Sequence, residues 1–89
     1  MDKSLSQKSI DVKYFSHFAE ITGKTSEVYK TETITLEDLW YELDSLYRLS
    51  NSGYLITSVR PAINHQFCEW QDRISNGDTV SFIPPVSGG

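Results

Sequence analysis

The sequence predicts a single α+β domain in which one long helix lies across a mixed β-sheet. Apolar residues alternate with a period of two from Ile10 and again over residues 79–83, which indicates strands near both ends of the chain. Between them, apolar residues at helical spacing from Leu36 to Tyr47 form one continuous stripe. The chain has 89 residues, enough for one small hydrophobic core and too few for a second domain.

The first strand is predicted to begin at Ile10. From there apolar and polar side chains alternate through Tyr14, as is typical of a half-buried strand. The polar stretch before it, residues 1–9, shows no periodicity, and we expect a disordered extension there. The folded domain is therefore expected to span residues 10–83.

A short helix and an edge strand should follow. Ser16 is placed to cap a helix of about one turn, since apolar residues recur after it at helical spacing. Gly23 suits the left-handed conformation that often follows a helix end. Residues 25–31 alternate again but contain few apolar side chains, which favours a second strand at the edge of the sheet.

The long helix carries the strongest local signal. Thr35 precedes it and Asp38 lies three residues later, so the pair has the form of a capping box. Six apolar residues at helical spacing are expected to pack on the sheet: Leu36, Leu39, Trp40, Leu43, Leu46 and Tyr47. Arg48 lies near the expected helix end, where a cation is favourable, and a turn is expected at 50–53.

The remaining strands are short. Residues 61–64 and 67–70 are predicted to form a hairpin with a tight turn at 64–66. The turn signal at 76–78 precedes the last strand, residues 79–83. Because the chain crosses the sheet through the long helix, parallel pairing of strands is possible.

The last six residues are expected to leave the sheet as an extended tail: Pro84, Pro85, Val86, Ser87, Gly88 and Gly89. The two prolines lack N–H donors, so the sheet ladder cannot continue through them. The residues after them are small, and the two glycines have no Cβ, so such an end can enter a narrow channel and present a bare carboxylate. An inert flexible end is the alternative interpretation.

Composition excludes several classes of function. Twelve acidic and eight basic residues give a net charge of −4, which argues against binding to nucleic acid or to an anionic membrane. No stretch is apolar enough for a membrane span or a secretory signal. The single cysteine, Cys68, excludes an internal disulfide and a multi-cysteine metal site. We therefore expect a soluble, cytoplasmic domain with no bound cofactor and no metal.

Isolated polar residues offer little chemistry. Cys68 lies in a predicted strand without basic neighbours, so we interpret it as a small core residue and not as a nucleophile. His17 and His65 are far apart in sequence and lack partners at metal-ligand spacing. Glu69 and Asp72 are interpreted as part of a solvated face and not as an acid–base pair.

The C-terminal sequence, Phe-Ile-Pro-Pro-Val-Ser-Gly-Gly at residues 82–89, closely resembles that of the small subunit of molybdopterin synthase, the MoaD family of ubiquitin-like sulfur carriers. Residues 12–23 resemble the first strand and short helix of that family. Residues 62–67 resemble its central hairpin, and residues 76–80 resemble the turn before its last strand. The stretches before Ile10 and between Leu49 and Arg60 do not show this resemblance.

This resemblance implies a β-grasp fold and the role of a sulfur carrier in molybdenum cofactor biosynthesis. In that family an activating enzyme uses ATP to adenylate the terminal glycine, here Gly89. Sulfur from a donor protein then replaces AMP and leaves a thiocarboxylate. The tail enters the large subunit of molybdopterin synthase, which transfers the sulfur to cyclic pyranopterin monophosphate. Gly88 would give clearance, and Pro84 and Pro85 would aim the tail.

The implied assembly is a heterotetramer whose catalytic residues belong to the large subunit, so this chain would be a non-catalytic, sulfur-donating subunit. The resemblance places Phe67, Ile83 and Phe82 on the surface that contacts the large subunit. Exposed apolar side chains near the tail would form the kind of patch that marks a partner surface. For Phe67, a core position is the alternative.

Other functions stay open on the sequence alone. Carriers of thiazole and cysteine biosynthesis share the Gly-Gly end. A ubiquitin-like protein modifier would also end this way, although no Lys or Arg follows Arg73, unlike the basic tail of ubiquitin. A β-grasp interaction module with an inert tail is the remaining alternative.

Overall fold

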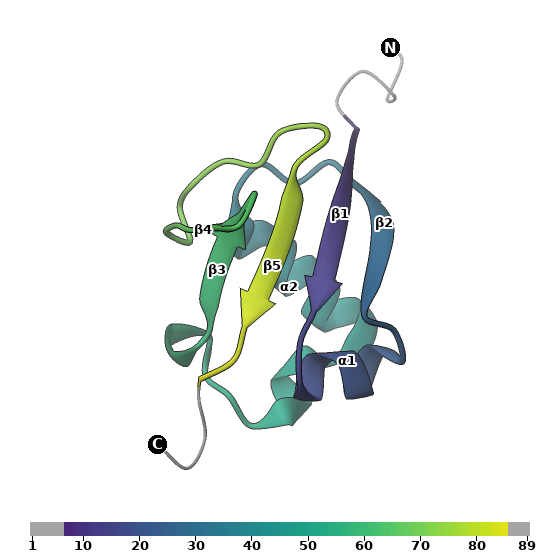
Figure 1. The fold of residues 1–89 in the computed structure, drawn as a ribbon, viewed down its shortest axis with the longest axis vertical. Coiled ribbons are helices and arrows are strands. Elements are labelled where there is room, and N and C mark those ends of the chain that lie inside the picture. Colours follow the sequence, from purple (N-terminus) through teal and green to yellow (C-terminus); the bar gives the residue numbers. More distant parts are fainter. Residues whose placement is uncertain (1–6, 86–89) are drawn as a thin grey trace.

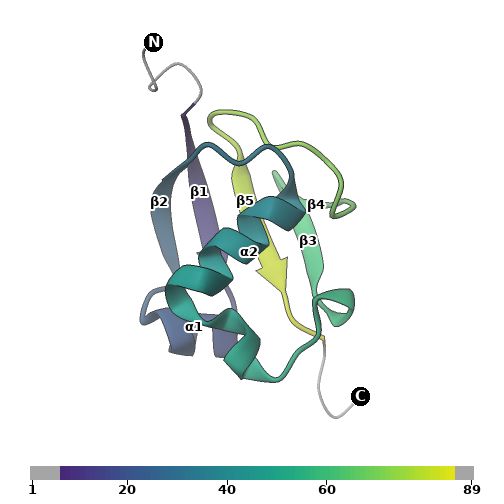
Figure 2. The same ribbon diagram turned by 180° about the vertical axis from the view of Figure 1, so that it is seen from behind.

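A five-stranded mixed sheet is covered on one face by a long helix (Figures 1 and 2). The computed structural model describes residues 7–85. The strands are β1 (Lys8–Tyr14), β2 (Ser26–Thr31), β3 (Arg60–Ile63), β4 (Gln66–Phe67) and β5 (Thr79–Ile83). The helices are α1 (His17–Thr22), α2 (Leu36–Tyr47) and two short 3₁₀ helices, η2 (Leu49–Ser52) and η3 (Ile56–Ser58). The predicted class, an α+β roll with one long and one short helix, is confirmed.

The first and last strands lie side by side in the centre of the sheet. The strand order is β2-β1-β5-β3-β4, with β1 and β5 parallel and the other neighbours antiparallel. β2 is an edge strand, as predicted. β5 is an interior strand held on both sides, so the residues that follow it start from a firmly fixed point.

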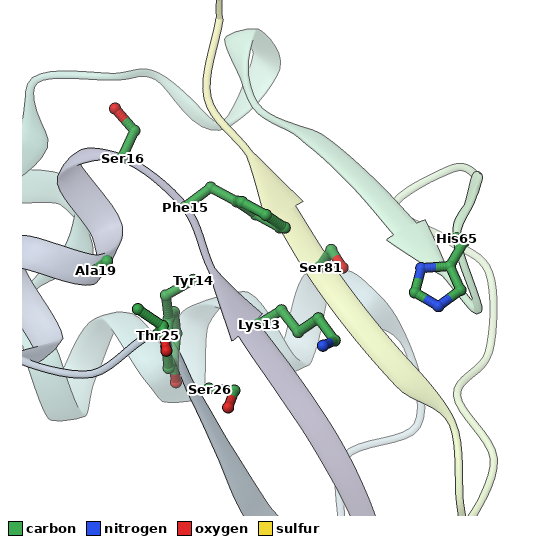
Figure 3. Close-up of a pocket in the computed structure, with 9 residues that line it drawn as sticks. All are labelled: Lys13, Tyr14, Phe15, Ser16, Ala19, Thr25, Ser26, His65 and Ser81. Carbon is green, nitrogen blue, oxygen red and sulfur yellow. The ribbon is translucent and has the colours of Figure 1, made fainter.

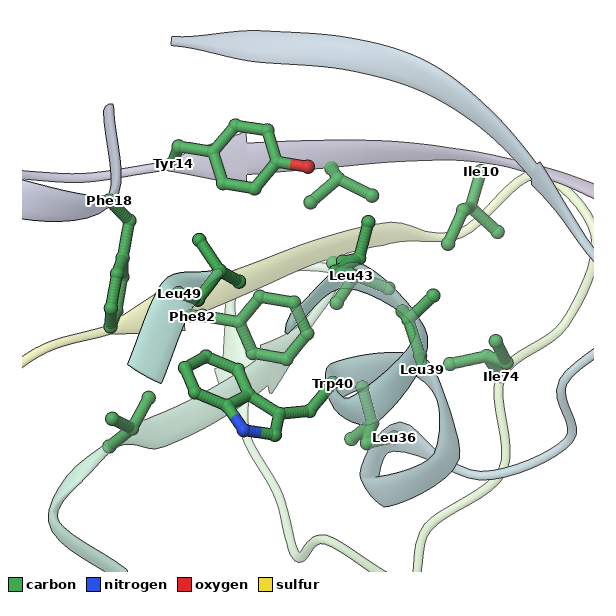
Figure 4. Close-up of a cluster of buried hydrophobic side chains, with 13 residues drawn as sticks. Ile10, Tyr14, Phe18, Leu36, Leu39, Trp40, Leu43, Leu49, Ile74 and Phe82 are labelled. Carbon is green, nitrogen blue, oxygen red and sulfur yellow. The ribbon is translucent and has the colours of Figure 1, made fainter. Parts of the chain in front are cut away.

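The core lies between the sheet and α2 (Figure 4). Trp40 of α2 contacts Phe18 and Phe82 edge-on, with ring centroids 5.5 and 5.4 Å apart. The buried cluster comprises Ile10, Val12, Tyr14, Phe18, Leu36, Leu39, Trp40, Leu43, Leu49, Val59, Ile74, Val80 and Phe82. β1, α1, α2, η2 and β5 each contribute to this cluster, and the partly buried Tyr29 of β2 and Ile63 of β3 pack against it.

The long helix begins as predicted, because the Thr35 hydroxyl accepts a hydrogen bond of 3.2 Å from the Asp38 N–H. Leu46, however, is 58% exposed, so its predicted place in the core was wrong. It lies on the flank of the apolar stripe, one residue before the helix ends. Arg48 takes a left-handed conformation with φ 61° and ends the helix.

The sheet begins two residues earlier than predicted. Lys8 and Ser9 pair with β2, so these two residues of the expected disordered extension belong to the fold. Backbone pairing holds them despite their polar side chains, and the Ser9 carbonyl also accepts a hydrogen bond of 2.8 Å from the Gly77 N–H. In the rest of the predicted extension, Gln7 is exposed without regular secondary structure, and residues 1–6 lie outside the described residues.

Two local predictions differ from the structure. Ser16 makes no side-chain cap; with φ 55° it turns the chain into α1, and only Gly23 behaves as expected at the other end. The predicted return strand 67–70 stops at Phe67. Beyond it, the Trp70 and Asp72 carbonyls accept hydrogen bonds from the first N–H groups of α2. This segment therefore binds the start of α2 instead of extending the sheet.

A polar network fixes one end of α2 to the sheet. The Glu27 carboxylate on β2 accepts hydrogen bonds from the hydroxyls of Tyr14 and Tyr47 and from the Lys24 ammonium. Tyr14 belongs to β1 and Tyr47 to α2, so one carboxylate joins three elements. Within residues 7–85, no helix has the length and apolar character that crossing a membrane requires.

Candidate functional site

The candidate site is the end of β5 and the sheet face around it. The strand stops at Ile83, and Pro84 and Pro85 have no regular secondary structure, as their missing N–H donors predict. Pro84 is half-buried and Pro85 is exposed. Four tail residues to which the sequence assigns roles lie outside the described residues: Val86, Ser87, Gly88 and Gly89. Their roles stay predictions.

One face of the sheet, which we call the open face, lies opposite α2 (Figure 1). Its residues follow from strand register, because paired residues point the same way and side chains alternate along a strand. Ile83 pairs with Arg60, and Ala62, two residues further along the same strand, pairs with Phe67. These four side chains therefore lie on the open face, next to the point where the tail leaves.

Phe67 and Ile83 both lie on the open face, and their predicted contact with a large subunit stays a prediction. Phe67 is 58% exposed, which excludes the alternative of a core position, and Ile83 is half-buried. The Arg60 guanidinium lies over the Phe67 ring, 4.3 Å from its centroid. A cation above an aromatic face is attracted electrostatically by the electrons of the ring.

The prediction of a surface position was wrong for Phe82. Its side chain is fully buried, because residues 82 and 83 of a strand point to opposite faces. The Phe82 ring stacks on Trp70, with centroids 5.8 Å apart and planes 11° from parallel. Phe82 therefore fixes the base of the tail from the core side.

Phe15 is a surface residue that the sequence analysis missed. It follows β1, is 44% exposed, and lies on the open face beside Lys13 and Ser81 (Figure 3). The signal was present, since Phe15 is out of phase with the buried alternation that ends at Tyr14. These residues and His65 line a surface hollow of about 560 Å³.

Other titratable residues do not form a second site. Burial, followed by the charge of Asp72, raises the pKa of the Cys68 thiol, so its thiolate is disfavoured and a nucleophilic role is not supported. His17 contacts the Tyr54 hydroxyl at 3.2 Å, and His65 sits in the hairpin turn with φ 72°. In the part of the chain that the structure describes, no three His, Cys, Asp or Glu residues cluster to hold a metal ion.

Glu69 and Asp72 form a local turn. The Asp72 carboxylate accepts a hydrogen bond of 2.9 Å from the Glu69 N–H, and both residues are exposed. This agrees with a solvated face. The described residues thus present an open sheet face with exposed aromatic side chains, next to the base of the tail.

Sequence comparisons identify relatives of this chain. Residues 12–89 match the ThiS family. The human molybdopterin synthase sulfur carrier subunit is 31% identical over 84 residues, which cover 90% of this chain and 93% of that protein.

Solved structures with the ubiquitin-like β-grasp fold superpose on most of the chain. A Pyrococcus furiosus protein assigned as subunit 1 of a molybdopterin converting factor has a TM-score of 0.72 and 27% identity, covering 89% of this chain and 99% of that one. Small archaeal modifier protein 1 from Methanosarcina acetivorans has a TM-score of 0.75 and 20% identity, covering 93% of this chain and 98% of that one. A complex of subunits 1 and 2 of the molybdopterin-converting factor from Helicobacter pylori contains a chain with a TM-score of 0.60 and 21% identity, covering 91% of this chain and 99% of that one. The expected β-grasp fold is confirmed.

Proposed function

Because this chain belongs to the ThiS family of sulfur carriers, we propose that it donates sulfur in molybdenum cofactor biosynthesis through a thiocarboxylate on Gly89. The observation that carries the proposal is the 31% identity to the human molybdopterin synthase sulfur carrier subunit over nearly the whole chain. The family match runs to Gly89, so it includes both the prolines after β5 and the glycine pair.

The chemistry requires activation of the tail by another protein. A free carboxylate is a poor electrophile, because its negative charge repels a nucleophile. An activating enzyme joins AMP from ATP to the Gly89 carboxylate and releases pyrophosphate. Sulfide released from a donor protein then attacks the carbonyl carbon and forms a C–S bond, and AMP leaves with the electron pair of the C–O bond that breaks. The sequence has no glycine-rich phosphate loop followed by Lys, which supports an ATP site on the activating enzyme.

The proposed partner is the large subunit of molybdopterin synthase, in a cytoplasmic heterotetramer. The Helicobacter pylori structure is a complex of subunits 1 and 2 of the molybdopterin-converting factor, which supports a large-subunit partner. Phe15, Phe67 and Ile83 would contact it on the open face, while the tail enters its active site. There the sulfur passes to cyclic pyranopterin monophosphate, and the catalytic groups are those of the large subunit.

Mass spectrometry tests the first step directly. The chain is incubated with an activating enzyme, ATP and a sulfur source, and we expect the mass change of one oxygen replaced by one sulfur, located on Gly89 by fragmentation. The same chain extended by one alanine after Gly89 is the control and should remain unmodified. An unchanged mass with an activating enzyme that modifies another carrier would contradict the proposal.

The pathway needs a second measurement, because a modifier protein shares this fold. We expect the thiocarboxylated chain to form a stable complex with the synthase large subunit and to convert cyclic pyranopterin monophosphate. Preferential binding to an enzyme of thiazole or cysteine biosynthesis would favour another sulfur pathway. Covalent attachment to lysines of many proteins in cells would favour a protein modifier.

A further inference from the structure

Two cations of the open face lie on the strands that flank β5. Lys13 belongs to β1 and pairs with Ser81, and Arg60 belongs to β3 and pairs with Ile83. Both therefore stand beside the strand that leads into the tail. Since neighbouring strands lie about 4.8 Å apart, the backbones of the two residues are separated by roughly 10 Å or slightly more.

We propose that Lys13 and Arg60 form a charged clamp that recognises two carboxylates on the tail-receiving partner, one on each side of β5. This inference rests on the proposed function, because it concerns the surface of the synthase large subunit. The partner surface that fits would place an apolar centre over Phe15, Ile83 and Phe67. Its two carboxylates would lie on opposite sides of β5, one within reach of each cation.

The Arg60 side chain is positioned for such a contact. Its guanidinium carbon lies over the Phe67 ring, 4.3 Å from the centroid, and a guanidinium presents several N–H donors that match a carboxylate. Arg60 is exposed, and within residues 7–85 it has no ion pair or side-chain hydrogen bond. A partner carboxylate would therefore meet a charge already held in place.

Lys13 is half-buried at the hollow on the other side of β5 (Figure 3). Phe15 and Ser81 line the same hollow, so a side chain that enters it meets an aromatic wall and an ammonium together. The described residues also offer Lys13 no ion-pair partner. The hollow therefore suits an acidic side chain of the partner.

The charge balance of the open face supports an acidic partner. The chain as a whole carries −4, but strand alternation places Lys13, Lys30 and Arg60 on this face against Asp11 alone. An acidic partner is repelled by most of the molecule and attracted here. Such an asymmetry orients the encounter and speeds association, with an effect that falls as salt rises.

The test is a titration of the large subunit with the full chain and a double charge reversal, Lys13→Glu with Arg60→Glu. We expect affinity to fall by about 10- to 100-fold and the salt dependence of binding to weaken. The matched control, Arg48→Glu with Arg73→Glu, changes the net charge equally at exposed positions outside the five strands. It should stay within about threefold of the original chain, because charges remote from the interface contribute little.

Each outcome has a distinct meaning. If the double reversal binds like the original chain, the charged clamp is overturned and the proposed function stands. If the original chain itself does not bind the large subunit, the proposed function fails, and the clamp with it. Circular dichroism checks folding; if the reversal unfolds, the neutral pair Lys13→Gln with Arg60→Gln replaces it, with an expected loss of at least about threefold.

Discussion

Glu27 shows how much one residue can connect. Its carboxylate is 15% exposed and accepts hydrogen bonds from two tyrosines and a lysine that come from three separate parts of the chain. Burial, the largest effect, raises the pKa of this carboxyl, but the hydrogen bonds from Tyr14, Tyr47 and Lys24 together lower it below its usual value. The carboxylate form is therefore the one that the fold stabilises.

Acid should weaken the protein through this carboxyl. A group whose pKa is lower in the folded state stabilises the fold above its unfolded pKa of about 4.3, and this stabilisation is lost as the pH falls through the folded value. We expect Glu27→Gln to lower the Tm at neutral pH, with a difference from the original chain that shrinks below about pH 4. Thermal melts from pH 2 to pH 7 measure this, with the exposed Glu32→Gln as control. Parallel acid profiles for Glu27→Gln and the original chain would contradict it.

The element that decides stability is α2. One face of this helix supplies four residues of the buried cluster, Leu36, Leu39, Trp40 and Leu43, and the segment after β4 satisfies its first backbone N–H groups. The packing holds the apolar face of the helix against the sheet, whereas the segment after β4 holds its first turn. Loss of the packing should lower the free energy of unfolding more than loss of the hydrogen bonds at the helix start, since buried apolar area is the larger stabilising contribution.

A pair of substitutions in this helix tests the packing. Leu39→Ala should lower the free energy of unfolding by about 2–5 kcal/mol, because it leaves a cavity in a fully buried site. Leu46→Ala removes the same atoms from an exposed position and should change it by less than about 0.5 kcal/mol. Urea unfolding compares the two. Equal effects would mean that the core is not where the structure places it.

At the scale of the whole molecule, the folded body and the tail proposed to react are separable. All thirteen members of the buried cluster lie between Ile10 and Phe82. The body can therefore be complete while the proposed chemistry takes place at residues outside it. This separation predicts that stability and activity respond to different changes.

Removal of Gly88 and Gly89 tests this separation. We expect an unchanged Tm, because the deletion takes nothing from the buried cluster, together with complete loss of sulfur transfer. Calorimetry and the conversion of cyclic pyranopterin monophosphate measure the two effects, with a Glu32→Gln chain of full length as control. Sulfur transfer by the shortened chain would rule out the tail mechanism.

Much of this architecture was predictable from local patterns. Alternation located β1, β2 and β5, and the Thr35 cap located the start of α2, because these signals depend on neighbours in sequence. What failed depends on contacts from far away. β4 is short because Trp70 stacks on Phe82 and its carbonyl binds the start of α2, and no pattern in residues 67–70 reveals either contact.

The candidate site was predicted in part, for the same reason. Phe67 and Ile83 were placed correctly on the surface, whereas Phe82 was assigned to the same surface although strand alternation opposes it to Ile83. The position of Arg60 over Phe67 joins two strands and follows only from their pairing. The grouping of charged residues on the open face could therefore be recognised only from the structure.

The parallel pairing of β1 with β5 has a mechanical consequence. β1 enters the sheet at one end and β5 leaves it at the other (Figure 1), so tension applied to the prolines and resisted at the start of β1 slides the two strands past each other. Under such shear the hydrogen bonds of the ladder share the load and must yield together instead of opening one by one. A protein that pulls on the C-terminal end of this carrier would therefore load the fold in the direction in which it resists force most strongly.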